Sequence, residues 1–106
     1  MVYVLLGPGF EEAEVVVPAD LLRRGGVEVA LVGLTGPEVT GSHNITLKAD
    51  MTLDQVSPDH TQALMLPGGM GGVAAINDSP EALELIRRIY KDGRAYLAAI
   101  CAAPSV

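Results

Sequence analysis

The sequence predicts an α/β fold, a doubly wound parallel sheet with helices on both faces that forms a three-layer sandwich. Three observations support this prediction: short apolar runs, amphipathic segments between them, and turns rich in glycine or proline directly after the runs. Runs that are apolar on both faces are typical of parallel strands covered on both sides. Their alternation with helical segments indicates a parallel, doubly wound arrangement.

The first strand is expected at residues 2–6, an apolar run that Gly7-Pro8-Gly9 ends. A helix is expected over residues 11–24, because acidic residues occupy its first turn and arginines its last. Gly25-Gly26 supplies the break at its end. Pro18 lies inside this segment and predicts a kink or an irregular turn.

A second strand is expected over residues 27–32. Next comes a small surface hairpin, with residues 39–40 and 45–47 as its arms. Residues 51–60 favour a short helical turn and a loop.

Residues 63–66 form the next expected buried strand, and a glycine-rich turn over residues 67–72 follows it. Ser79 and Pro80 suit the N-cap and first position of a helix that extends to about residue 91. Residues 95–100 are the last expected buried strand. The sheet is therefore predicted to be flavodoxin-like, within one domain over residues 1–106.

Composition and charge exclude several classes of function. The formal net charge of −6 opposes binding to nucleic-acid phosphates. The single cysteine rules out an internal disulfide and favours a reducing, cytoplasmic location. No apolar run has the length of a membrane span, so no membrane partner is expected.

Cys101 is the strongest candidate for chemistry. It follows the last expected strand, is flanked by small residues, and precedes the start of a helix at Ala102-Ala103-Pro104. This pattern is typical of a nucleophile elbow, a tight turn that projects its side chain at the carboxyl edge of the sheet. The N-terminus of a helix also favours the thiolate form. The alternative is a buried cysteine that acts only as a small apolar residue.

Two further motifs lie near the same edge. The glycines of Gly68-Gly69-Met70-Gly71-Gly72 would let backbone N–H groups approach a substrate oxygen, although an ordinary flexible turn has the same composition. No Lys-Ser/Thr pair follows, so this is not a P-loop. Glu11, Glu12 and Glu14 lie in one helical turn, and one of them could point toward Cys101, but the spacing does not choose among them.

The two histidines, His43 and His60, fall on expected loops. Neither has metal ligands at suitable spacing in the sequence, so no metal site is expected. Neither is placed by the sequence as a base for Cys101.

Taken together, these motifs resemble the ThiJ/PfpI superfamily, in particular the branch of the Parkinsonism-associated protein deglycase. The resemblance covers nearly the whole chain. The motifs that carry it are Gly9-Phe10-Glu11-Glu12-Ala13-Glu14, Val17-Pro18 with Asp20, Arg23-Arg24-Gly25-Gly26, Leu66-Pro67-Gly68-Gly69 and Ala98-Ala99-Ile100-Cys101-Ala102-Ala103-Pro104.

The resemblance implies that Cys101 is the reactive cysteine and that Glu14 hydrogen-bonds it. It also implies that the amides of Gly69 and Ala102 form an oxyanion pocket. The implied function is glyoxalase or deglycase chemistry on 2-oxoaldehydes or their protein adducts, in a homodimer without a cofactor. The alternatives are an oxidative-stress sensor or chaperone-like protein that uses Cys101 oxidation without turnover, or a purely structural domain in which Cys101 is inert.

The sequence departs from the family pattern in two places. Protease-like members place histidine directly after the cysteine, where this chain has Ala102, and this weakens a peptidase interpretation. Family domains also continue well past the elbow, and a family histidine lies in that later part. We therefore expect a domain that lacks its C-terminal part, completed by a second polypeptide segment or by a dimer.

Overall fold

The computed structural model describes residues 1–106 and contains a five-stranded sheet in the order β5-β2-β1-β6-β7, with every neighbouring pair parallel. The strands of this sheet are β1 (Val2–Leu6), β2 (Val29–Gly33), β5 (Met51–Thr52), β6 (Ala63–Leu66) and β7 (Tyr96–Ala99). A separate antiparallel hairpin pairs β3 (Glu38–Thr40) with β4 (Thr46–Lys48). The helices are α1 (Glu12–Arg24), α2 (Met70–Asn77) and α3 (Pro80–Asp92), with the 3-10 turns η1 (Leu53–Gln55), η2 (Pro58–His60) and η3 (Ala103–Ser105).

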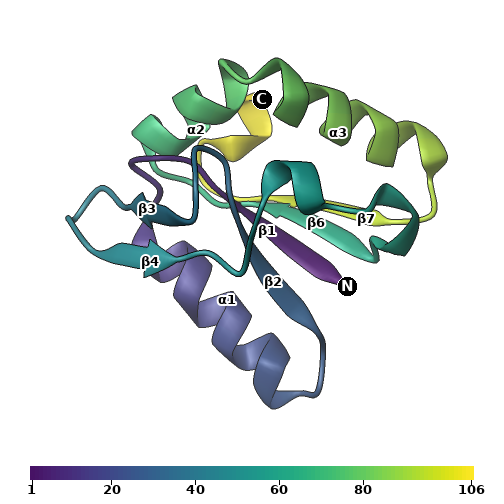
Figure 1. Cartoon of the computed structure of the whole chain (residues 1–106), viewed down its shortest axis with the longest axis horizontal. Helices are drawn as coiled ribbons and strands as arrows, with labels where there is room; N and C mark the ends of the chain where they lie inside the picture. The colour runs from purple at the N-terminus through teal and green to yellow at the C-terminus, as the bar shows by residue number, and fades with distance from the viewer.

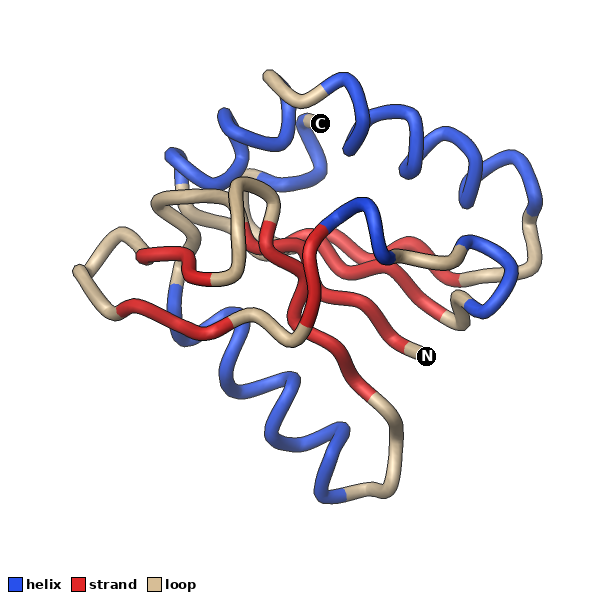
Figure 2. Tube along the Cα trace, viewed as in Figure 1, coloured by secondary structure: helices blue, strands red, loops and turns tan.

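The elements form three layers, as the sequence predicted. In Figures 1 and 2, α1 lies on one face of the sheet, whereas α2 and α3 lie on the other, next to the C-terminus. Alternating side chains of β1 explain this arrangement: Val4 and Leu6 pack in a buried cluster with α1, and Tyr3 and Leu5 pack in a second cluster with α2 and α3. The α/β fold class is therefore confirmed.

Two segments adopt a different structure from the expected one. Residues 51–52 form the short strand β5 beside β2, and the helical turn expected over residues 51–60 begins only after it, at η1. Helix α2 begins at Met70, within the glycines that were expected to form a turn. The glycines are required by packing, because a Cβ on Gly71 would lie 3.0 Å from the carbonyl oxygen of Pro8, and one on Gly72 would lie 2.9 Å from Cα of Phe10. Glycine has a low intrinsic propensity for helices, but the close packing of the start of α2 against residues 8–10 outweighs it.

The last strand also differs from expectation. All four residues of β7 are exposed, although the sequence predicted a buried strand. β7 pairs only with β6 and forms the edge of the sheet, so one side of its backbone carries no neighbouring strand.

Pro18 does not end α1, which continues to Arg24. None of the helices is both long enough and apolar enough to cross a membrane.

Candidate active site

The turn after β7 holds Cys101 in an unusual backbone conformation. Cys101 has φ 60°, in the left-handed region that residues other than glycine rarely adopt. The turn is held by two hydrogen bonds, from the Ile100 N–H to the Leu66 carbonyl at 3.2 Å and from the Ala103 N–H to the Ile100 carbonyl at 3.0 Å. Cys101 is a free, exposed cysteine at the carboxyl edge of the sheet. This geometry is that of a nucleophile elbow, and it excludes the alternative of a buried cysteine.

Glu14 reaches the same place from α1. Its Oε1 accepts a hydrogen bond from the Gly68 N–H at 3.0 Å, and the carboxylate is partly buried. A Cβ built on Gly68 would collide with Glu14 Oε1 and lie 2.7 Å from Cβ of Cys101. Glu14 and Cys101 thus border the same small space beside Gly68, but the expected hydrogen bond between them is absent, because the carboxylate binds the Gly68 N–H instead.

The backbone amides of Gly69 and Ala102 are free to bind a ligand. Neither N–H donates to an acceptor within the protein. Gly69 has φ 93°, and a Cβ there would lie 2.6 Å from the backbone nitrogen of Glu11, so this position also requires glycine. Unpaired N–H groups of this kind can stabilise a developing oxyanion.

These groups line one open pocket of about 390 Å³. Its walls come from the start of α1, the β3–β4 hairpin, the start of α2 and the elbow; they are Glu11, Glu14, Ser42, Gly69, Met70, Gly71, Cys101 and Ala102. The four predicted site residues are therefore brought together by the fold. Ser42 was not identified from the sequence, because long-range bonds bring the hairpin to this edge, among them the bond from its N–H to the Phe10 carbonyl at 2.8 Å.

Glu12 has a different role from Glu14. It is buried and accepts hydrogen bonds from the backbone N–H of His43 at 2.8 Å and of Ile45 at 3.2 Å. Burial by itself would raise the pKa of this carboxyl, but hydrogen bonds from the amides of Glu12, Ile45 and His43 and from the His43 ring lower it to about 2. Glu12 thus ties the β3–β4 hairpin to α1.

Neither histidine lines the Cys101 pocket. Nδ1 of His43 lies 3.2 Å from Glu12 Oε1 and 3.5 Å from Glu11 Oε1, and the ligand atoms of these three residues lie within 4.8 Å of one another. The fold thus assembles a cluster that sequence spacing did not reveal, yet both Glu12 oxygens already accept hydrogen bonds. His60, the last residue of η2, hydrogen-bonds Ser57 directly before this turn, with 2.8 Å between its Nδ1 and Ser57 Oγ.

Comparison with known proteins identifies the family. The model of the DJ-1/PfpI family matches residues 1–106, the whole chain. The chain belongs to the DJ-1/PfpI family. This confirms the resemblance that the motifs indicated.

Three relatives illustrate the similarity. The chain is 42% identical over 104 residues to the Drosophila melanogaster protein dj-1beta, covering 97% of this chain and 55% of the relative. The crystal structure of Drosophila DJ-1beta superposes with a TM-score of 0.91 at 40% identity, over 98% of this chain and 56% of that one. Deglycase PfpI of Pyrococcus furiosus is 33% identical over 97 residues, which cover 92% of this chain and 57% of the deglycase. A structure described as Toxoplasma gondii DJ-1, oxidized, has a TM-score of 0.89 at 33% identity, over 99% of this chain and 57% of that one.

In each comparison, the chain spans little more than half the length of its relative.

Proposed function

We propose that the protein is a cysteine-dependent glyoxalase or deglycase that acts on 2-oxoaldehydes or their protein adducts. The observation that carries this proposal is the elbow conformation of Cys101 beside Glu14, which Gly68 holds in place. The similarity to a protein named as a deglycase supports the same class of activity.

The pocket suits each step of such a reaction. The thiolate of Cys101 attacks the aldehyde carbon of the substrate, and its oxygen becomes the oxyanion of a hemithioacetal held by the amides of Gly69 and Ala102. Glu14 receives the thiol proton before attack and returns a proton to the oxyanion. Glu14 then removes the C–H of the former aldehyde carbon as a proton, which gives an enediol, and returns this proton to the neighbouring ketone carbon. The hydroxyl proton on the first carbon passes to the ketone oxygen, so the first carbon is oxidised to a thioester as the second is reduced to an alcohol. Water hydrolyses the resulting thioester, which releases a 2-hydroxy acid and restores the thiol.

A second candidate is an oxidative-stress sensor. Cys101 is exposed, so peroxide can reach its sulfur, and oxidation would give a sulfenate and then a sulfinate without any substrate. One structurally similar relative is described as oxidized. In this function the groups around Cys101 would stabilise the oxidised sulfur rather than a substrate oxygen.

We also propose a homodimer in the cytoplasm and a second polypeptide segment beside β7. Val16, Val17, Leu21 and Ile45 are exposed apolar residues of α1 and the hairpin, and an apolar surface of this kind favours association. β7 has one unpaired edge, and its Tyr96 and Leu97 side chains are exposed. An added strand would satisfy the backbone groups at this edge.

The test is conversion of methylglyoxal to lactate by the full chain without glutathione. Cys101→Ala should abolish turnover, whereas His60→Ala, outside the pocket, should retain it. Equal turnover by Cys101→Ala would refute the cysteine mechanism. Oxidation of Cys101 by peroxide, together with no turnover by the wild type, would favour the sensor.

A further inference from the structure

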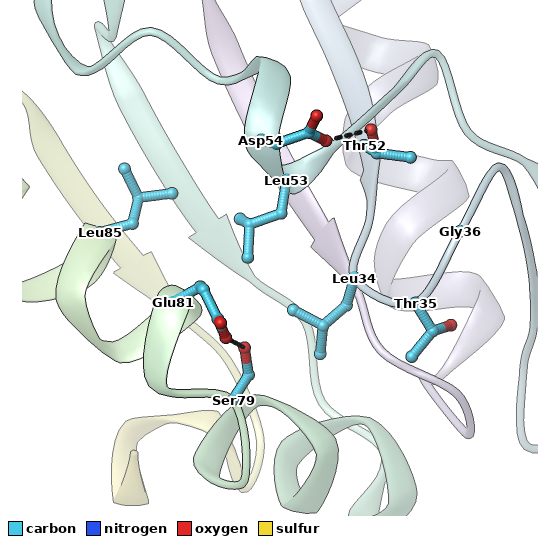
Figure 3. A pocket seen from close by; sticks show the side chains of 9 residues that line it. All are labelled: Leu34, Thr35, Gly36, Thr52, Leu53, Asp54, Ser79, Glu81 and Leu85. Carbon is cyan, nitrogen blue, oxygen red and sulfur yellow. Dashed lines mark hydrogen bonds between the residues drawn. The ribbon is translucent and has the colours of Figure 1, made fainter.

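A second cavity lies at the carboxyl edge of the sheet and shares no lining residue with the Cys101 pocket. Its volume is about 440 Å³, within the range of small-molecule sites. Three segments that are distant in the sequence line it, and it is open to solvent: the loop after β2, the turn η1 after β5, and the start of α3. Figure 3 shows this cavity and its side chains.

The floor of the cavity is apolar. Leu34, Leu53 and Leu85 come from the three different segments and lie around one central space in Figure 3. All three are partly buried and pack against the core cluster on the α2 and α3 side of the sheet. This floor suits an aliphatic group of a ligand.

The rim of the cavity carries negative charge and hydroxyl groups. Asp54 and Glu81 stand on η1 and α3, and neither forms an ion pair. Asp54 Oδ1 accepts a hydrogen bond from Thr52, and Glu81 Oε2 accepts one from Ser79 at 3.5 Å. The second oxygen of each carboxylate has no hydrogen-bond partner in the protein.

The charge of the rim selects a cation. No lysine, arginine or histidine lines the cavity, so the carboxylates are not neutralised by the protein. The N-terminus of α3 would attract an anion, but the Ser79 hydroxyl already caps it by accepting from the Ala82 N–H at 3.2 Å, and Glu81 occupies its first turn. An anionic ligand would therefore be repelled.

The absence of aromatic side chains from the lining limits the class of cation that the cavity can bind. Quaternary ammonium groups are recognised by aromatic faces, and none lines this cavity. A primary ammonium group has three N–H donors, which match the unpaired carboxylate oxygens and the rim hydroxyls. We propose that this cavity is a binding site for a primary aliphatic ammonium ligand, with the alkyl chain on the leucine floor and the ammonium group at the rim, against the unpaired carboxylate oxygen of Asp54 or of Glu81.

The test uses n-pentylammonium as the probe and the full chain as the protein. Binding is followed by NMR shifts of the backbone amides of Leu34, Leu53 and Leu85. 1-Pentanol, pentanoate and pentyltrimethylammonium have the same chain length and serve as comparison ligands. We expect n-pentylammonium to bind most tightly of the four, and its affinity to fall as salt rises while that of 1-pentanol stays constant.

Charge-removing variants locate the site. Asp54→Asn or Glu81→Gln, whichever removes the carboxylate that holds the ammonium group, should weaken n-pentylammonium binding by roughly threefold to fivefold, the upper range for an exposed ion pair. Glu84→Gln is the matched control, because Glu84 is exposed on the same helix but outside the cavity. Cys101→Ala should bind the probe like the wild type, which separates this proposal from the catalytic one.

Three results would overturn the proposal. The first is that n-pentylammonium binds no better than 1-pentanol or pentanoate. The second is that neither Asp54→Asn nor Glu81→Gln weakens binding more than Glu84→Gln does. The third is that the probe shifts resonances away from the leucine floor.

Discussion

Replacing Gly68 by alanine tests the geometry of the candidate site without removing either of its reactive side chains. The added methyl group would lie 2.7 Å from Cβ of Cys101, whereas carbon atoms in contact prefer about 3.5–4.0 Å. It would also collide with Glu14 Oε1. Gly68 does not have a positive φ, so the cost arises from these contacts and not from backbone strain.

The two neighbours of Gly68 differ in their freedom to move. Cys101 is held by the elbow, so relieving the overlap requires a backbone shift, and such overpacking typically costs about 1–3 kcal/mol. Glu14 can withdraw its flexible side chain, but it then loses the bond from the Gly68 N–H, a hydrogen bond to a charged group worth roughly 1.5 kcal/mol. Alanine recovers roughly 0.4–1 kcal/mol by restricting the unfolded chain. We therefore expect a net loss of about 1.5–4 kcal/mol.

Urea unfolding of the protein together with the second segment proposed beside β7 measures this loss, and the rate of iodoacetamide alkylation reports on Cys101 in the folded protein. Gly25→Ala is the matched control, because Gly25 has φ −80° and a Cβ there would meet its nearest neighbour at 3.5 Å. It should be neutral or stabilising by less than about 1 kcal/mol. If Gly68→Ala is as stable as Gly25→Ala and alkylates at the wild-type rate, Gly68 does not hold Glu14 and Cys101 together.

Three further predictions concern the acids, the thiol and the sheet edge. The pKa of Glu12 is lowered to about 2, so its carboxylate should contribute stability above pH 4.5 that is lost as the pH falls toward 2. Acid unfolding of Glu12→Gln should lack this component, and identical profiles would contradict the role given to Glu12. Glu14→Gln should change the rate of Cys101 oxidation by peroxide severalfold in a mass-spectrometric assay, whereas Glu11→Gln should change this rate little. Equal effects of the two substitutions would show that Glu14 has no special role beside Cys101. Residues 1–106 expressed alone should self-associate or unfold without a sharp transition, because β7 has an exposed edge; a monomer in size-exclusion chromatography with cooperative unfolding and full activity would refute this.

The peroxide assay also tests the thiol itself. Cys101 should be modified faster than the cysteine of an unstructured peptide at neutral pH, because the elbow exposes its sulfur beside unpaired amides. A peptide that reacts faster than the protein would argue for an inert thiol.

Local features of the sequence were sufficient to predict much of the fold. β1 and β6 form where β-branched or apolar runs predicted them, and α3 begins after the predicted cap, with the Ser79 hydroxyl accepting from the Ala82 N–H. The elbow at Cys101 was also predicted, because it depends on a strand, small neighbours and a helix start that are adjacent in the chain. Each of these features is set by hydrogen bonds and steric limits within a few residues.

Contacts between distant segments decided the rest. Glu11, Glu12 and Glu14 share one helical turn, and spacing alone could not assign them. The structure turns Glu14 toward Gly68, and it turns Glu12 toward the amides of His43 and Ile45. The start of α2 within glycines, and the exposure of β7, likewise depend on which segments lie beside them. A carboxylate side chain points toward the N–H groups that can donate to it. The donors to Glu12 and Glu14 are 31 to 54 residues away along the chain, so only tertiary packing can bring them to these side chains.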